Sequence, residues 1–176
     1  MHTLIAGSED KDRHEFLERL LERSGVTVPL CGFRTTMSAE DLEGNAKIHI
    51  HPISGDMKFL EENLVGLCKN RHSEVYPEVF EKYLYLLENP PRGGLVVMDG
   101  IGPMEGAAPR FRESVLKALD GDIPVLATVR DKDTEFLLAV RKHPKVRCFV
   151  LGGDDEKLFL EALEFFAPRI TNAAPS

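Results

Sequence analysis

The second half of the chain alternates between apolar runs and segments of helix length, and this pattern constrains the fold more than any other feature. Apolar runs at residues 94–98, 123–129 and 146–151 are separated by segments with helical spacing at 110–119 and 132–142, and another such segment follows at 154–166. Apolar strands that alternate with helices are typical of parallel sheets whose two faces are covered by right-handed crossover helices. The pattern therefore predicts an α/β fold with a mainly parallel sheet.

The first half adds another strand-helix unit and a predicted antiparallel ribbon. An apolar strand at residues 2–6 is followed by Phe16, Leu17, Leu20 and Leu21 at helical spacing. Strands predicted at 26–33 and 47–53 are expected to pair as the ribbon. A helix is predicted at 56–69, and another begins at Pro77 and ends before Asn89. We expect one domain over residues 1–167 and a flexible C-terminal tail over residues 168–176.

Composition excludes several classes of protein. A chain of 176 residues can bury a core without disulfides or metals, and a formal net charge of −7 argues against nucleic-acid or membrane partners. Cys31, Cys68 and Cys148 form no CxxC pair, and no apolar run approaches the length of a membrane span. We therefore expect a cytoplasmic protein whose cysteines are small core residues.

The turn after the first strand is the first candidate site, because ligands of open parallel sheets bind beyond the carboxyl ends of the strands. Residues 7–14, GSEDKDRH, have the spacing of the phosphate-binding loop GxxxxGK followed by Ser or Thr, and only Gly7 matches outright. Arg13 replaces the lysine, and His14 replaces the hydroxyl residue that coordinates Mg²⁺. Asp10 and Asp12 stand at or near glycine positions and place negative charge where phosphates would bind. Taken alone, the segment is better explained as an ordinary acidic strand-to-helix turn capped by Asp.

A second candidate lies at the end of the strand VVMD. The carboxylate of Asp99 is placed as one that contacts nucleotide-bound Mg²⁺. The continuation DGIGPME at residues 99–105 resembles the DEIGKME signature of a small nucleoside-triphosphatase family, P-loop enzymes first known from thermophiles and with a cancer-related human member. Other segments resemble the family in the same order, namely GFRTT at 32–36, YPEVFE at 76–81, VLATV at 125–129 and PKV at 144–146.

This resemblance, over about residues 2–166, implies a three-layer P-loop NTPase-like fold with an antiparallel ribbon inserted in a mainly parallel sheet. It implies a metal contact at Asp99 and, only in an active enzyme, catalytic roles for Asp99 and Glu105. Gly100 occupies the place of an acidic residue expected to activate water, which removes a general base. The implied nucleotide or phosphate contacts are Gly7, Ser8, Lys11, Arg13 and His14.

Three functions fit these residues. The altered loop favours a non-hydrolysing relative that binds a nucleotide or another phosphate-bearing small molecule, or that acts as a scaffold. The first alternative is a slow triphosphatase, in which Arg13 and Asp99 organise Mg²⁺ and a nucleoside triphosphate. The second alternative is a partner-binding protein with no nucleotide site.

Other polar residues have a simpler interpretation. His49 and His51 share one face of a strand at a spacing compatible with a metal, but a solvated ribbon face explains them more simply. Glu105 fits a solvated surface carboxylate as well as a site residue. We also interpret one basic cluster as solvent-exposed surface, namely Lys132, Arg141 and Lys142.

Overall fold

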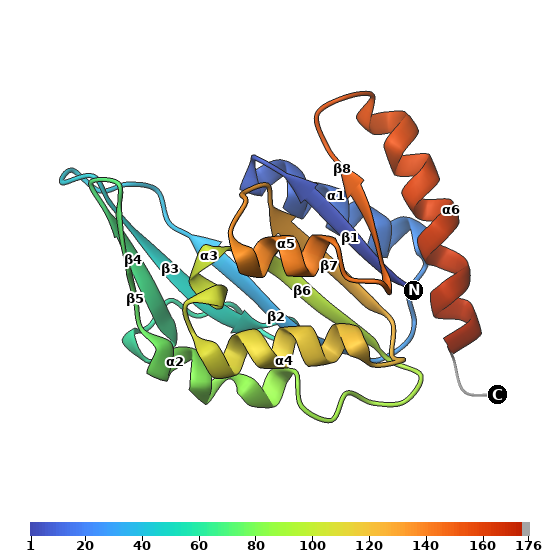
Figure 1. Cartoon of the computed structure of the whole chain (residues 1–176), viewed down its shortest axis with the longest axis horizontal. Helices are drawn as coiled ribbons and strands as arrows, with labels where there is room; N and C mark the ends of the chain where they lie inside the picture. Colours follow the sequence, from blue (N-terminus) through green and yellow to red (C-terminus); the bar gives the residue numbers. More distant parts are fainter. Residues whose placement is uncertain (174–176) are drawn as a thin grey trace.

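The computed structural model describes the backbone of residues 1–173 and the side chains of residues 1–170. The described chain forms an eight-stranded sheet in the order β5-β4-β3-β2-β6-β7-β1-β8 (Figure 1). Strands β1 (His2–Gly7), β6 (Leu95–Ile101), β7 (Val125–Arg130) and β8 (Val146–Val150) run parallel, which confirms the prediction from the apolar runs. Strand β2 (Leu30–Met37) runs parallel to β6 at the other side of this group.

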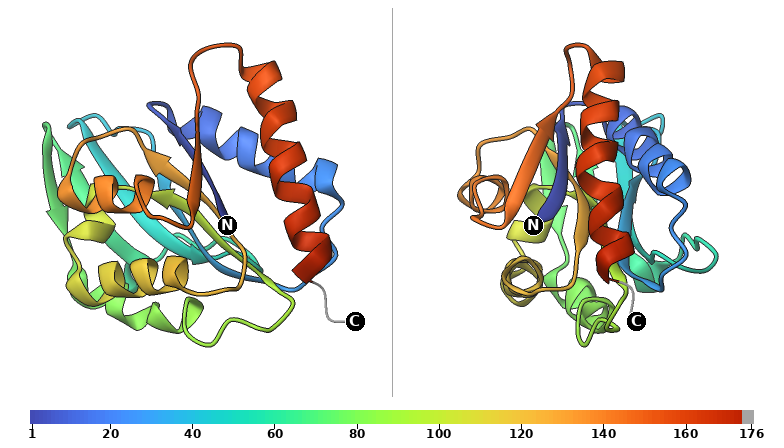
Figure 2. Two further views of the ribbon diagram at one scale, coloured as in Figure 1. Left: turned by 45° about the vertical axis from the view of Figure 1, so that its right-hand side comes forward. Right: turned by 90° about the vertical axis from the view of Figure 1, so that its right-hand side faces the viewer.

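Helices cover both faces of the sheet. On one face lie α1 (Asp10–Ser24) and α6 (Asp155–Ala173), and on the other lie α4 (Pro109–Asp120) and α5 (Glu135–Arg141) (Figure 2). Successive strand residues serve opposite cores, since Leu4 and Ala6 pack with the α4 side while Ile5 packs with the α1 side. A strand buried on both faces needs apolar residues at every position, which explains the continuous apolar runs.

An antiparallel extension continues the sheet beyond β2. Strand β3 (Asn45–Pro52) pairs with β2 and β4 (Leu64–Lys69), and β5 (His72–Val75) completes the edge. The predicted ribbon is thus confirmed, although its first strand begins at Leu30 and not at residue 26. In Figure 1 this extension forms the left side of the molecule, with α2 (Pro77–Lys82) at its lower end.

The prediction of a helix at residues 56–69 is wrong. The segment contains a loop, the short 3-10 helix η1 (Glu61–Asn63) and β4. Pairing of β4 with β3 buries Val65 completely, and this non-local contact outweighs a weak local helical pattern. Asn70 and Arg71 both have positive φ, as a two-residue hairpin turn between β4 and β5 requires.

Two helices differ in length from their predictions. The helix that begins at Pro77 divides into α2 (Pro77–Lys82) and the 3-10 helix η2 (Leu84–Leu86). Helix α6 continues through Pro168 to Ala173, so most of the predicted flexible tail is helical, and residues 174–176 lie outside the described part. A further short helix, α3 (Pro103–Gly106), follows β6. Within the described residues, no helix has the length and apolar character needed to cross a membrane.

Candidate functional site

A cleft of about 380 Å³ opens at the carboxyl ends of the parallel strands, between the start of α1 and the antiparallel extension. Its lining includes residues from α1, β2, β3, β6, α3 and the loop after β7. Strand β7 separates β1 from β6 in the sheet, and His14 of α1 reaches across to Asp99 near the tip of β6. Gly7 and Ser8 are not among the lining residues, whereas five other predicted residues are: Lys11, Arg13, His14, Asp99 and Glu105.

The turn between β1 and α1 is short. Only Ser8 and Glu9 separate the two elements, and α1 begins at Asp10. A GxxxxGK loop has four residues between its two glycines, and two of the corresponding residues here, Asp10 and Lys11, already belong to the helix. The backbone therefore does not form the extended loop that wraps around a chain of phosphates.

Arg13 is buried and bonded to its own turn. Its guanidinium donates a hydrogen bond of 2.5 Å to the carbonyl oxygen of Gly7 and another to the carboxylate of Asp10. The residue is 3% exposed, and burial together with the charge of Arg130 lowers the pKa of its guanidinium. The cation expected to hold a phosphate thus stabilises the β1–α1 turn instead.

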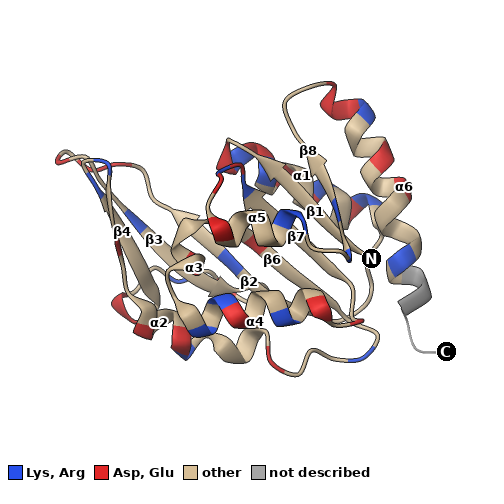
Figure 3. Cartoon of the chain, in the orientation of Figure 1, with Lys and Arg blue, Asp and Glu red and all other residues tan. Residues whose placement is uncertain are grey.

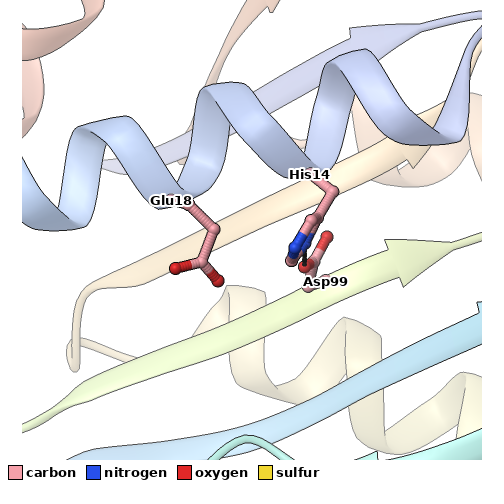
Figure 4. Close-up of side chains that lie close together, drawn as sticks. All are labelled: His14, Glu18 and Asp99. Atoms are coloured by element: carbon pink, nitrogen blue, oxygen red, sulfur yellow. Dashed lines mark hydrogen bonds and ion pairs between the residues drawn. The ribbon is translucent and has the colours of Figure 1, made fainter.

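His14 lies beside Asp99 (Figure 4). Its Nδ1 is 2.6 Å from Oδ2 of Asp99, and this hydrogen bond raises the pKa of His14. Burial raises the pKa of Asp99, but hydrogen bonds from His14 and Thr128 and the charge of Arg34 outweigh burial and hold that pKa below its ordinary value. The contact therefore favours a protonated His14 beside an ionised Asp99.

The surroundings of Asp99 do not fit Mg²⁺ as the structure stands. His14, Glu18 and Asp99 offer ligand atoms within 4.8 Å of one another. However, Arg34 donates from Nε to Asp99 at 2.9 Å and from its terminal nitrogen to Glu18, so a guanidinium cation already joins the two carboxylates. Thr128 donates to the other oxygen of Asp99 at 2.9 Å. A divalent cation would have to displace Arg34 and His14.

Glu105 is a buried residue of the cleft, so its interpretation as a solvated surface carboxylate is wrong. It is 2% exposed, and its Oε2 accepts a 2.7 Å hydrogen bond from the backbone N–H of Gly102. Burial raises its pKa to about 7. Hydrogen bonds from Gly102 and Thr35 and the charge of Arg130 act in the opposite direction, and burial outweighs them.

The backbone at Gly100 is committed to glycine. The residue has a φ of +111° and lies in an irregularity of the β6–β7 pairing between Asp99 and Ile101. A Cβ atom there would lie 2.4 Å from Oγ1 of Thr35. The acidic residue of the DEIGKME signature therefore cannot be accommodated without a change of backbone.

Two basic residues of the cleft escaped the sequence interpretation. Arg130 ends β7, and Lys132 follows it in the loop before α5; both line the cleft. Lys132 was expected on a solvent face, and it is exposed but also lines the cleft. Arg141 was expected there too, but it is largely buried and donates to the backbone of this loop. Lys142 is exposed as expected. Two cations directly after a parallel strand are a signal that sequence inspection can use.

The histidine pair on β3 is not solvated, which corrects that expectation. His49 and His51 are both buried, and the ring of Phe59 packs edge-on against each of them. Burial lowers the pKa of both imidazoles. The three cysteines are free thiols, half-buried against the core: Cys31, Cys68 and Cys148.

Comparison with known proteins adds a family. A family profile described as NTPase matches residues 5–162. The chain belongs to this NTPase family. The match spans both turns of the cleft, so the resemblance carried by the DGIGPME segment is confirmed at the level of family.

Curated relatives in the family are nucleoside-triphosphatases named THEP1. The protein of Thermofilum pendens is 55% identical over 40 residues, 23% of this chain and 22% of that protein. The protein of Ignicoccus hospitalis is 39% identical over 70 residues, 39% of this chain and 40% of that protein. The matched segments thus cover less than half the length of each relative.

Two solved structures share the fold. THEP1 from the hyperthermophile Aquifex aeolicus superposes with a TM-score of 0.67 at 21% identity, over 92% of this chain and 95% of that one. A human cancer-related nucleoside triphosphatase gives a TM-score of 0.58 at 19% identity, over 99% of both chains. The P-loop NTPase-like fold predicted for this family is confirmed.

Proposed function

We propose that this chain binds a nucleotide or another phosphate-bearing small molecule in the cleft without hydrolysing it efficiently. The observation that supports this most is the state of Arg13 and His14. Arg13 is bonded to Gly7 and Asp10, and His14 is paired with Asp99. The side chains at the lysine and hydroxyl positions of a phosphate-binding loop are therefore engaged within the protein, while the cleft itself remains open.

The part of the cleft around Gly100 and Glu105 also argues against fast hydrolysis. Activation of water needs a base near the transferred phosphate, and Gly100 has no side chain to supply one. Glu105 is buried and holds its proton up to a pKa of about 7, which makes it a poor base below that pH. We therefore expect retention of a ligand and little turnover.

The test combines binding with phosphate release. Ligands that bind the native state raise the melting temperature, so a thermal-shift screen of nucleotides and phosphates reports on binding. Phosphate release from ATP, GTP, CTP and UTP with Mg²⁺ reports on turnover. We expect stabilisation by some phosphate compounds and no release above that of an Asp99→Asn variant. Release that depends on Asp99 would replace this proposal by the slow triphosphatase.

The slow triphosphatase is kept as the first alternative because Asp99 and Glu105 both line the cleft. The second alternative, a partner-binding protein without a nucleotide site, predicts no stabilisation by any compound of the screen.

We also propose a cytoplasmic location. The three free thiols at Cys31, Cys68 and Cys148 support it.

A further inference from the structure

The cleft carries surplus positive charge in a chain whose net charge is −7. The charge of Arg13 is opposed by Asp10 and that of Arg34 by Asp99. Burial raises the pKa of Glu105 to about 7, so this acid carries little charge below neutral pH. Along α4, by contrast, acidic and basic residues are interspersed (Figure 3). The charged lining of the cleft consists of Lys11, Arg13, Arg34, Arg130 and Lys132 against Asp10, Asp99 and Glu105.

Arg130 and Lys132 have donors that are free to bind a ligand. Lys11 lies 3.9 Å from Glu15 on the same helix. Arg130 makes one ion pair, to Asp10 at 3.6 Å, which is longer than a hydrogen bond. The ammonium of Lys132 has no hydrogen bond or ion pair to any residue that the structure describes. Lys11 and Arg130 thus make only contacts longer than a hydrogen bond, and Lys132 makes none with the described residues. Of these three cations, Arg130 and Lys132 lie two residues apart at the end of β7 and share one wall of the cleft.

The loop that carries both residues is held in place by Arg141 of α5. The guanidinium donates to the carbonyl oxygens of Arg130 and Lys132, at 3.3 and 2.7 Å, and to the carboxylate of Asp133 at 2.6 Å. On the other side, the backbone N–H of Asp131 donates to Gly7 at 3.1 Å. A loop tied on both sides loses little freedom when its side chains bind a ligand.

The opposite wall of the cleft is apolar. Four residues form this surface, which we call the methionine wall: Met37 of β2, Ile48 of β3, Met57 of the loop after β3 and Met104 of α3. Met37 and Met57 are 47% and 49% exposed, so their side chains are accessible to a ligand. Thioether side chains adapt their shape to flat or irregular apolar groups. This wall suits the uncharged part of a ligand.

We propose that Arg130 and Lys132 form a subsite for one dianionic phosphate, and that the cleft binds a phosphate monoester whose apolar or aromatic body lies against the methionine wall. This inference rests on the proposed function and narrows its ligand. A phosphate monoester carries a charge of roughly −1.5 to −2 at neutral pH, which two free cations match. A triphosphate brings further negative charge toward Asp10 and Asp12 at the start of α1.

Calorimetric titration of the whole chain with phenyl phosphate, inorganic phosphate and ATP, all without Mg²⁺, tests the subsite. We expect phenyl phosphate to bind at least about tenfold more tightly than inorganic phosphate, because its ring buries apolar surface. Arg130→Met and Lys132→Met are each expected to weaken phenyl phosphate about tenfold or more, since each removes a charged hydrogen bond to the phosphate. Lys142→Met removes the same charge from an exposed position outside the cleft and should change nothing.

A variant of the methionine wall tests binding of the ring separately from binding of the phosphate. Met37→Gln should weaken phenyl phosphate and leave inorganic phosphate unchanged. If ATP binds and phenyl phosphate does not, this inference is wrong while the proposed function stands. If no phosphate compound binds, both fail. A loss in Lys142→Met equal to that in Lys132→Met would show a general effect of net charge and would also overturn the subsite.

Discussion

Ionisation of Glu105 links the cleft to the stability of the fold. Its pKa is about 7 in the folded protein against an ordinary value of 4.5, so the folded state holds the proton more tightly than the unfolded state. The resulting stabilisation is fully present below pH 4.5 and is lost as pH rises through about 7. An ionised Glu105 at higher pH opposes folding.

A Glu105→Gln variant tests this directly. The amide keeps an acceptor for the N–H of Gly102 and cannot ionise. At pH 8 we expect the variant to be more stable than the parent, by up to about 3 kcal/mol, and near pH 4.5 the two should differ little. Urea denaturation at both pH values measures the difference. A constant difference between the two pH values would contradict the protonated carboxyl.

The His14–Asp99 pair gives a spectroscopic prediction. Since the hydrogen bond that His14 donates to Asp99 raises the pKa of His14, replacing Asp99 by Asn should lower that pKa toward 6.5. The stabilisation from this pair should be present below pH 6.5 and lost as pH rises through the raised pKa of His14. Titration of the His14 ring signals by NMR, in the parent and in Asp99→Asn, measures the shift. His143, which lies beside Asp120 and far from the substitution in sequence, provides the internal control.

Sequence reasoning located site residues better than it described their partners. Asp99, His14 and Arg13 were expected in one cleft because the carboxyl ends of parallel strands meet at one edge of a sheet. The bond from Arg13 to Gly7 depends on where a long side chain folds back, and no sequence motif encodes it. Lys132 is exposed as expected, but its place in the lining of the cleft was not predicted, because a basic residue in a loop looks the same in sequence whether or not a cleft lies beside it.

At the scale of elements, the irregularity in β6 determines which residue can follow Asp99. A side chain at Gly100 meets both a positive φ and the hydroxyl of Thr35. We expect Gly100→Ala to destabilise the protein by about 1 to 3 kcal/mol and Gly100→Glu to restore no hydrolysis. Chemical denaturation measures the first and phosphate release the second.

The double variant Gly100→Ala with Thr35→Ala separates the two causes. Removal of the Thr35 hydroxyl relieves the contact at 2.4 Å but leaves φ at +111°. Part of the lost stability should therefore return, and the part due to the backbone should remain. Full recovery would mean that the contact alone, and not the conformation, reserves this position for glycine.

The elements that sequence reasoning recovered are those with strong local patterns. The parallel strands and α4 have continuous or amphipathic apolar patterns and were placed within a few residues. Strand β4 was taken for part of a helix because Leu64, Val65 and Leu67 fit either structure, and the choice depends on pairing with β3. Non-local pairing of this kind is not visible in a short window of sequence.

At the scale of the whole molecule, the side chains that occupy the start of α1 stabilise the fold. Arg13 closes the β1–α1 turn and His14 connects α1 to β6, so both residues support the packing of α1 on the sheet. A cradle for polyphosphate would need flexible glycines in the same place. The chain therefore has a short turn closed by Arg13 at the place where a phosphate-binding loop needs flexible glycines.

Replacement of four residues should reverse this arrangement: Asp10→Gly, Asp12→Gly, Arg13→Lys and His14→Thr. Loss of the Arg13 and His14 contacts should lower the melting temperature by several degrees, at roughly 2 to 4 degrees per kcal/mol for a domain of this size. The glycines let backbone amides turn toward phosphates and remove two repulsive charges, so affinity for a non-hydrolysable ATP analogue should rise.

A thermal-shift measurement checks this prediction. Because a ligand that binds the native state stabilises that state, the analogue with Mg²⁺ should restore part of the melting temperature of the variant and change that of the parent little. Hydrolysis of ATP should stay poor, since Gly100 still supplies no base. A destabilised variant with unchanged affinity would mean that α1 still begins at residue 10, and that the two-residue turn, not its side chains, prevents triphosphate binding.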